Sequence, residues 1–95
     1  MNQFQKMCWR QCKKLLEKVR CSFTGPIPVQ GKRETYVIVQ FEFGSDRVEL
    51  FIYVDEAGIM INGKSWRIFE RADYRTEDEL ITAYAKHLSL LLHGD

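Results

Sequence analysis

The sequence predicts an α+β fold, a two-layer sandwich in which an N-terminal helix and a C-terminal helix cover one face of a four-stranded antiparallel meander. Apolar residues recur at three- and four-residue spacings near both ends of the chain, as in amphipathic helices. The middle of the chain alternates β-branched or aromatic residues with polar ones, and turn residues interrupt it three times, at 44–46, 55–58 and 62–63. A length of 95 residues leaves room for one domain, residues 1–95.

The composition indicates a globular protein in a reducing compartment. Hydrophobic residues make up 45% of the chain and charged residues 28%. The cysteines Cys8, Cys12 and Cys21 are odd in number and form no CxxC motif, which excludes a disulfide framework. We see no signal peptide, and no apolar run approaches the ~18 residues of a membrane span. We therefore expect a cytoplasmic protein that does not cross a membrane.

The first segment, residues 2–20, is predicted to be an amphipathic helix with Asn2 as its N-cap. Its apolar stripe consists of Phe4, Met7, Cys8, Cys12, Leu15, Leu16 and Val19. Residues 22–34 then form a connection, in which Pro26 and Pro28 allow at most an edge strand.

Two strands are predicted over residues 35–43 and 47–54, joined by a tight turn centred on Ser45-Asp46. Every residue pair that faces the core in this register is apolar on both sides, which supports the pairing. The pairs are Phe43 with Val48, Phe41 with Leu50, Val39 with Ile52, and Val37 with Val54.

A second hairpin and a closing helix follow. Asn62-Gly63 favours a two-residue type I′ turn between residues 59–61 and 64–70, and this turn sets Ile59 opposite Trp66. The closing helix starts near Thr76, which together with Glu79 forms a capping box, and it ends at Gly94.

The predicted sheet has one wholly apolar face and one mixed face. The apolar face consists of Val37, Val39, Phe41, Phe43, Val48, Leu50, Ile52, Val54, Ile59, Ile61, Trp66 and Ile68. The reverse face consists of Tyr36, Ile38, Gln40, Glu42, Glu49, Phe51, Tyr53, Met60, Asn62, Ser65, Arg67 and Phe69.

The reverse face resembles a partner surface, because aromatic residues lie beside acidic ones. In the predicted register Glu42 is directly opposite Glu49, and like charges in that arrangement are unfavourable. The alternative is that the first helix or the connection at 22–34 folds over this face.

Charge is distributed unevenly along the chain. Residues 1–33 hold eight Lys/Arg and one Glu, whereas residues 34–70 hold three basic and seven acidic side chains. Either end could steer a charged partner, or the basic end packs against the acidic body. The first helix presents Trp9 among the cations Lys6, Arg10, Lys13, Lys14, Lys18 and Arg20. This pattern predicts either nucleic-acid binding with Trp9 as a stacking residue or a simple solvated face.

Catalytic machinery is not recognisable, so we expect a protein that is not an enzyme and that uses no cofactor. His87 has no Ser/Asp spacing that suggests a triad, and neither phosphate-binding glycine motif occurs. Cys8 and Cys12 share a helical face but belong to the apolar stripe, which favours buried thiols over metal ligands.

Residues 58–84 contain a strand pair followed by the acidic helix entry Tyr-Arg-Thr-Glu-Asp-Glu-Leu at residues 74–80. This stretch, about a third of the chain, resembles small bacterial immunity proteins of contact-dependent toxin–immunity systems. The resemblance implies a protein that binds a toxin domain, often a nuclease, and blocks its active site. Acidic and aromatic side chains would match a nuclease's basic substrate groove. The corresponding positions are Glu42, Glu49, Phe51 and Tyr53 on the reverse face, or Asp55, Glu56, Glu77 and Asp78 at the loop and helix start.

Our leading hypothesis is therefore a small protein-binding module that neutralises a cognate toxin. One alternative is a nucleic-acid-binding or regulatory domain that acts through the basic first helix. Another is a secretion-type chaperone or homodimeric adaptor that uses the reverse face.

Overall fold

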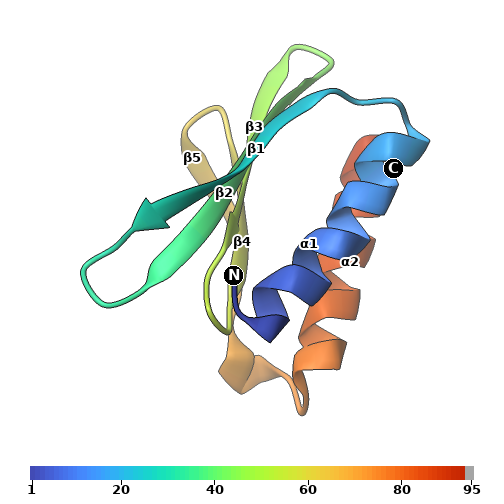
Figure 1. Ribbon diagram of the computed structural model, residues 1–95. Coiled ribbons are helices and arrows are strands. Elements are labelled where there is room, and N and C mark those ends of the chain that lie inside the picture. The colour runs from blue at the N-terminus through green and yellow to red at the C-terminus, as the bar shows by residue number, and fades with distance from the viewer. Residues whose placement is uncertain (94–95) are drawn as a thin grey trace.

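The computed structural model describes residues 1–93 and contains two helices and a five-stranded antiparallel sheet (Figure 1). The elements in chain order are α1 (Gln3–Lys18), β1 (Phe23–Gln30), β2 (Thr35–Phe43), β3 (Asp46–Ile52), β4 (Ala57–Ile61), β5 (Lys64–Phe69), a 3₁₀ turn (Arg71–Asp73) and α2 (Glu77–His93). The strands lie in the sheet in the order in which they occur in the chain. The α+β class, the meander and the two terminal helices are confirmed, but the predicted number of four strands is wrong.

The additional strand, β1, lies where the sequence suggests a connection. It occupies an edge of the sheet and pairs only with β2, so the missing N–H groups of Pro26 and Pro28 cost little. The register between β1 and β2 shifts between Thr24 and Ile27, on either side of the first proline. Segment 22–34 therefore widens the sheet and does not fold over its reverse face.

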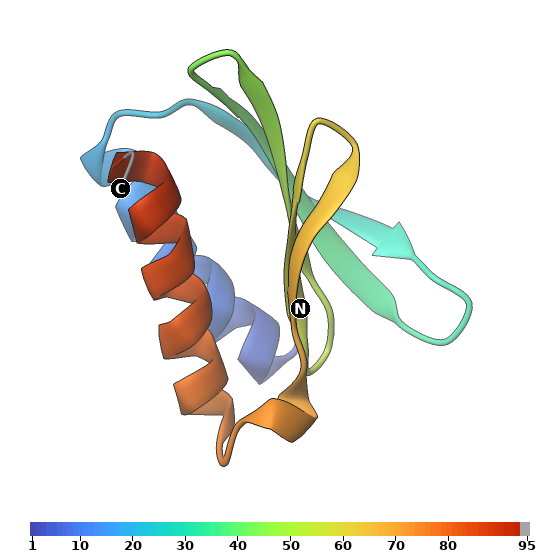
Figure 2. The same cartoon turned by 180° about the vertical axis from the view of Figure 1, so that it is seen from behind.

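Both helices pack on the same side of the sheet and run side by side in the same direction (Figures 1 and 2). The alternative in which α1 covers the reverse face is therefore wrong as well. Asn2 caps α1 as predicted, and the Gln5 side chain completes a capping box with it. Gln5 also anchors the helix to the sheet, because its Nε2 donates hydrogen bonds to the carbonyl oxygens of Thr35 at 3.1 Å and Ile52 at 3.3 Å.

The core fills the space between the helices and the inner face of the sheet. Its helical members are Phe4, Cys8, Trp9, Cys12, Leu16, Leu80, Ile81, Tyr84, Leu88 and Leu92. Its sheet members are Val37, Val39, Phe41, Val48, Leu50, Ile52, Ala57, Ile59 and Phe69. Cys8 and Cys12 are fully buried, and a hydrogen bond between them, together with burial, raises the pKa of the Cys12 thiol well above its ordinary value.

The turn between β2 and β3 differs from the predicted one. The loop consists of two residues, Gly44 and Ser45, so that Phe43 pairs with Asp46. Gly44 has a φ of +63°, a left-handed conformation that glycine adopts without steric cost. The pairing is displaced by two residues from the prediction, and the same residues still face the core because side chains alternate with a period of two.

This displacement removes the predicted like-charge contact. Glu42 pairs with Arg47, and Glu49 pairs with Gln40. The predicted position of Glu42 directly opposite Glu49 is therefore wrong, and each glutamate faces a side chain with which it can interact favourably.

Strand β5 also departs from the prediction, because a β-bulge interrupts its pairing with β4. Ile59 pairs with Arg67 and Met60 with Ser65, which leaves Trp66 as the extra residue. Trp66 and Ile68 are 45% and 56% exposed, and Phe69 is buried instead. Ile68 lies on the outer face and not on the predicted core face, whereas Trp66 stays on the helix side beside His87 but is not buried in the core as predicted. The hairpin turn itself is as expected, with positive φ at both Asn62 and Gly63.

The start of α2 matches half of the predicted capping box. The backbone N–H of Glu79 donates to the Thr76 hydroxyl at 3.2 Å, but the Glu79 carboxylate accepts from the N–H of Arg75 and not from that of Thr76. The predicted stop at Gly94 lies outside the described residues.

Candidate functional site

The outer face of the sheet, on the side away from both helices, carries a row of apolar residues that crosses all five strands. The cross-strand pairs align Ile27, Ile38, Phe51, Gly58 and Ile68 in this order from β1 to β5. Within residues 1–93 no helix or loop packs over this row (Figures 1 and 2). Apolar residues that line up in this way without a covering element are typical of a contact surface for another molecule.

Aromatic side chains border the apolar row. The rings of Tyr36 and Tyr53 lie 4.9 Å apart between centroids, and the Phe51 ring lies 6.5 Å from that of Tyr36. Beside them, the missing side chain of Gly58 leaves a shallow depression of ≈ 60 Å³, which Phe51, Tyr53, Met60 and Ile68 help to line. Large aromatic residues around a small depression are the usual anchors of a protein interface.

Carboxylates gather at the tyrosine end of the outer face. They belong to Glu34, Asp55, Glu56 and Glu70, and the last three flank β4 and β5. Partial burial, followed by the negative charges of Asp55, Glu70 and Glu34, raises the pKa of Glu56. Partial burial, Tyr36 and the carboxylates of Glu56 and Glu34 raise the pKa of Tyr53. The outer face therefore has an acidic end next to its tyrosine pair.

Some of the predicted site residues lie on the outer face or at its acidic end, and the others lie further away. Phe51 and Tyr53 lie half-buried on the outer face, and Asp55 and Glu56 lie in the turn at its acidic end. Glu49 lies further along the same face, where its carboxylate accepts a hydrogen bond from Gln40 Nε2 at 3.1 Å.

The remaining predicted residues lie further from the acidic end. Glu42 is exposed next to Arg47, close to the turn between β2 and β3. Glu77 and Asp78 are at or near the first residue of α2, in the helix layer on the opposite side of the sheet. One partner surface on the outer face therefore includes six of the eight predicted residues at most and excludes Glu77 and Asp78.

Sequence reasoning missed Ile27, Ile68 and the carboxylates of Glu34 and Glu70. Ile27 lies in a segment that the prolines made look like a connection, and Ile68 changes face because of the bulge in β5. Glu34 lies just before β2 and Glu70 just after β5, and the pairing of the strands brings both carboxylates near Glu56. Alternation along the strands, which places Ile38, Phe51 and Tyr53 on the reverse face, was the sequence signal for this region.

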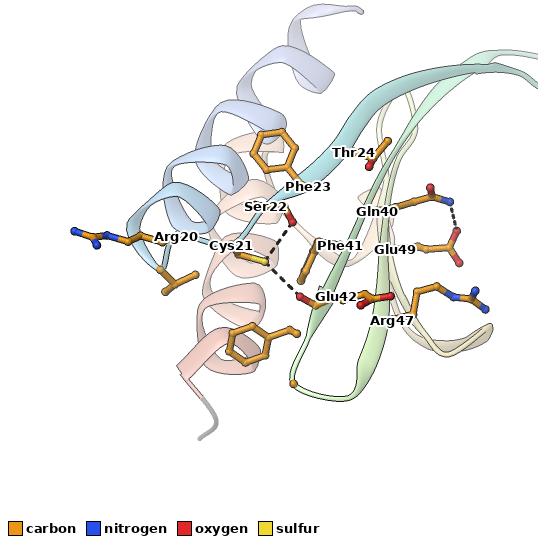
Figure 3. A pocket seen from close by; sticks show the side chains of 13 residues that line it. Arg20, Cys21, Ser22, Phe23, Thr24, Gln40, Phe41, Glu42, Arg47 and Glu49 are labelled. Atoms are coloured by element: carbon orange, nitrogen blue, oxygen red, sulfur yellow. Dashed lines mark hydrogen bonds between the residues drawn. The ribbon is translucent and has the colours of Figure 1, made fainter.

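An open groove of ≈ 960 Å³ lies where α1 ends and β1 begins (Figure 3). Glu42, Arg47 and Glu49 are at one side, and Cys21 is at the other. The Cys21 thiol donates weak hydrogen bonds to the carbonyl oxygens of Glu42 at 3.6 Å and Ser22 at 3.7 Å. Burial raises its pKa, which keeps the thiol protonated and poorly nucleophilic. Cys21 therefore lacks the thiolate character of a reactive cysteine.

The basic side chains of α1 lie on the outside of the helix layer. All are exposed: Lys6, Arg10, Lys13, Lys14 and Lys18 in the helix, and Arg20 two residues after its end. Trp9, by contrast, is only 8% exposed and packs edge-on against Phe23, with the ring centroids 5.2 Å apart. The prediction that Trp9 is available to stack on a base is therefore wrong, and only the charges remain in support of nucleic-acid binding.

Other classes of site find little support in the described residues. Across residues 1–93, His, Cys, Asp and Glu side chains form no group of three or more that could hold a metal ion. No helix in the same range has the length and apolar character needed to span a bilayer.

Comparisons with protein-family models, with curated proteins and with solved structures found no match for this chain.

Proposed function

We propose that this chain is a protein-binding module and that its outer sheet face binds a partner with a basic, partly apolar surface. The apolar row across five strands carries the proposal, since no described element covers it. The inner face of the same sheet packs against both helices through the core, so we expect the outer face to keep its shape before binding. A rigid surface loses little conformational entropy when a partner docks.

The charge of the face selects the chemistry of the partner. Glu34, Asp55, Glu56 and Glu70 lie along one side of the row, next to Tyr36 and Tyr53. Acidic groups at the rim attract a basic partner and speed its association, while the apolar and aromatic groups provide most of the affinity.

A toxin domain with a basic substrate groove, such as that of a nuclease, has this chemistry. We therefore propose that the chain is an immunity protein that binds such a domain and blocks its active site. The resemblance of residues 58–84 to immunity proteins supports the same interpretation.

The first test of the proposal is whether a reading frame next to this gene encodes a toxin-like domain. Production of that domain in a bacterial host should stop growth, and co-production of this chain should restore it. Calorimetry should detect a complex, and Tyr36→Ala should weaken it by about 30-fold, the effect of losing an aromatic anchor of about 2 kcal/mol.

Gln11→Ala provides the matched control, because Gln11 is exposed on the helix layer. It should leave both rescue and affinity unchanged. If growth is not restored, the toxin part of the proposal is wrong. If Gln11→Ala weakens the complex and Tyr36→Ala does not, the binding face has been misassigned.

A further inference from the structure

The two edges of the sheet differ in their ability to accept another strand. Edge strand β1 contains Pro26 and Pro28, which have no N–H to donate, and its register is irregular. Edge strand β5 contains no proline, and only β4 pairs with it. An unpaired edge without proline presents backbone donors and acceptors to an extended chain.

Large apolar side chains are exposed on both sides of the β5 edge. Ile68 is 56% exposed on the outer face, and Trp66 is 45% exposed on the helix side. The bulge turns Trp66 toward α2, where its ring lies 4.1 Å from the ring of His87 between centroids. The tryptophan is therefore held in place before any partner arrives, and an extended segment along β5 would contact an apolar group on each side.

The charges of β5 decide which strand fits. The strand contains Lys64 and Arg67 and no acidic residue, and Lys86 of α2 is also exposed. Charged residues and bulges keep edge strands from pairing indiscriminately, so the sign of the charge determines which segments are rejected. A second copy of β5 would bring another basic strand against this one, and the two net positive charges would repel each other. An acidic segment would be attracted to Lys64 and Arg67 instead of repelled by them.

We propose that the β5 edge binds an extended acidic peptide segment of a partner protein as a sixth strand. Side chains on opposite faces of this segment contact Ile68 and Trp66, and its carboxylates lie near Lys64 and Arg67. This site adjoins the acidic end of the outer face at Glu70, and Ile68 is common to both surfaces, but it does not depend on the toxin proposal.

A phage-displayed library of random ten-residue peptides tests the proposal against the full chain. Selected peptides should combine acidic with β-branched residues and should lack proline. A synthetic copy of one should protect backbone amides of β5 from hydrogen exchange. Its affinity should fall at least tenfold in the double variant Lys64→Glu/Arg67→Glu, since both charge contacts become repulsive.

The double variant Lys13→Glu/Lys14→Glu is the matched control, because it makes the same charge change on the exposed face of α1. It should bind the peptide as the natural chain does. Lys64→Glu alone, at an exposed position next to the hairpin turn, reports on the same site without disturbing the stacking of Arg67 on Phe69 at 4.6 Å. Tyr36→Ala should bind the peptide with unchanged affinity, so that the β5 proposal and the toxin proposal are tested independently.

Three results would overturn the proposal. The first is a library that yields no binder, or only binders without acidic residues. The second is a footprint outside β5, or equal losses in the two double variants. The third is dimerisation of the chain through β5 in sedimentation, which would identify a second copy as the occupant.

Discussion

His87 lies in an environment that opposes its protonation. Its ring packs between Trp66 and Phe69, with centroids 4.1 and 5.6 Å away, and its Nε2 is buried without a hydrogen-bond partner among residues 1–93. Burial, followed by the charge of Arg67 on β5, lowers the pKa of His87 below its ordinary value of 6.5. The neutral ring is therefore the form that the fold accommodates.

This shift predicts a pH dependence of stability. Because the pKa is lower in the folded state, the unfolded chain binds more protons between the folded pKa and 6.5. The free energy of unfolding should therefore be highest above pH 6.5 and should decrease as the pH falls toward the folded pKa. Urea unfolding between pH 7.5 and 5 measures the dependence.

The variant His87→Gln should flatten the pH dependence in that window, because it removes the titrating group. Lys86→Gln, at the exposed neighbouring position, controls for a general change in the charge of α2. A dependence that survives in His87→Gln would have to originate from another group.

At the scale of elements, the hydrogen bonds of Gln5 anchor the start of α1 to the sheet. The side chain is 3% exposed, donates to the carbonyl oxygens of Thr35 and Ile52, and accepts from the backbone N–H of Asn2 at 2.9 Å. Gln5→Ala leaves these buried groups without a partner and should lower the free energy of unfolding by about 1–3 kcal/mol. Gln11→Ala, exposed on the same helix, should change it by less than about 0.5 kcal/mol in urea unfolding. Equal effects of the two variants would contradict the role of Gln5.

The patterns in the sequence predicted the elements with regular periodicity and failed where tertiary geometry decides. Both helices and the inner-face residues of β2 and β3 follow directly from hydrophobic spacing. The fifth strand was missed because proline weakens a strand signal although an edge tolerates it. The register was wrong because Gly44, and not Asp46, occupies the turn. The bulge at Trp66 changes which side chains face the core, and no local pattern marks it.

The candidate site was also predictable only where regular alternation along a strand determines which face a residue occupies. Alternation placed Phe51 and Tyr53 on the reverse face, and both lie there. The completed row depends on β1 and on the bulge in β5, which bring Ile27 and Ile68 to the same face. The acidic end assembles carboxylates from three separate connections, and linear sequence carries no signal for that proximity.

At the scale of the whole molecule, the cations of α1 and the carboxylates of the acidic end lie on different layers, although Glu77 and Asp78 of α2 are also in the helix layer. The cations of α1 are exposed in the helix layer, whereas the acidic end borders the outer face of the sheet. The uneven charge along the chain is therefore also a separation in space, and the basic end is not neutralised by packing against the acidic body. A charged partner should approach one layer in preference to the other.

This separation predicts how association with the proposed toxin domain depends on salt. Salt shortens the range of electrostatic attraction to about 10 Å at 0.1 M, so the association rate constant should fall as salt rises. Asp55→Asn/Glu56→Gln/Glu70→Gln should lower that rate constant about tenfold at low salt and flatten its salt dependence, with a smaller effect on dissociation. Stopped-flow fluorescence measures both rates.

The matched comparison, Lys13→Gln/Lys14→Gln/Lys18→Gln, removes the same number of charges from the helix layer. It removes like charge from the approach of a basic partner, so the association rate constant should stay the same or rise slightly. A marked decrease in the association rate constant of this variant would mean that the partner binds the basic surface of α1. The outer face would then be the wrong docking surface, and an acidic partner of α1 would explain the charge separation instead.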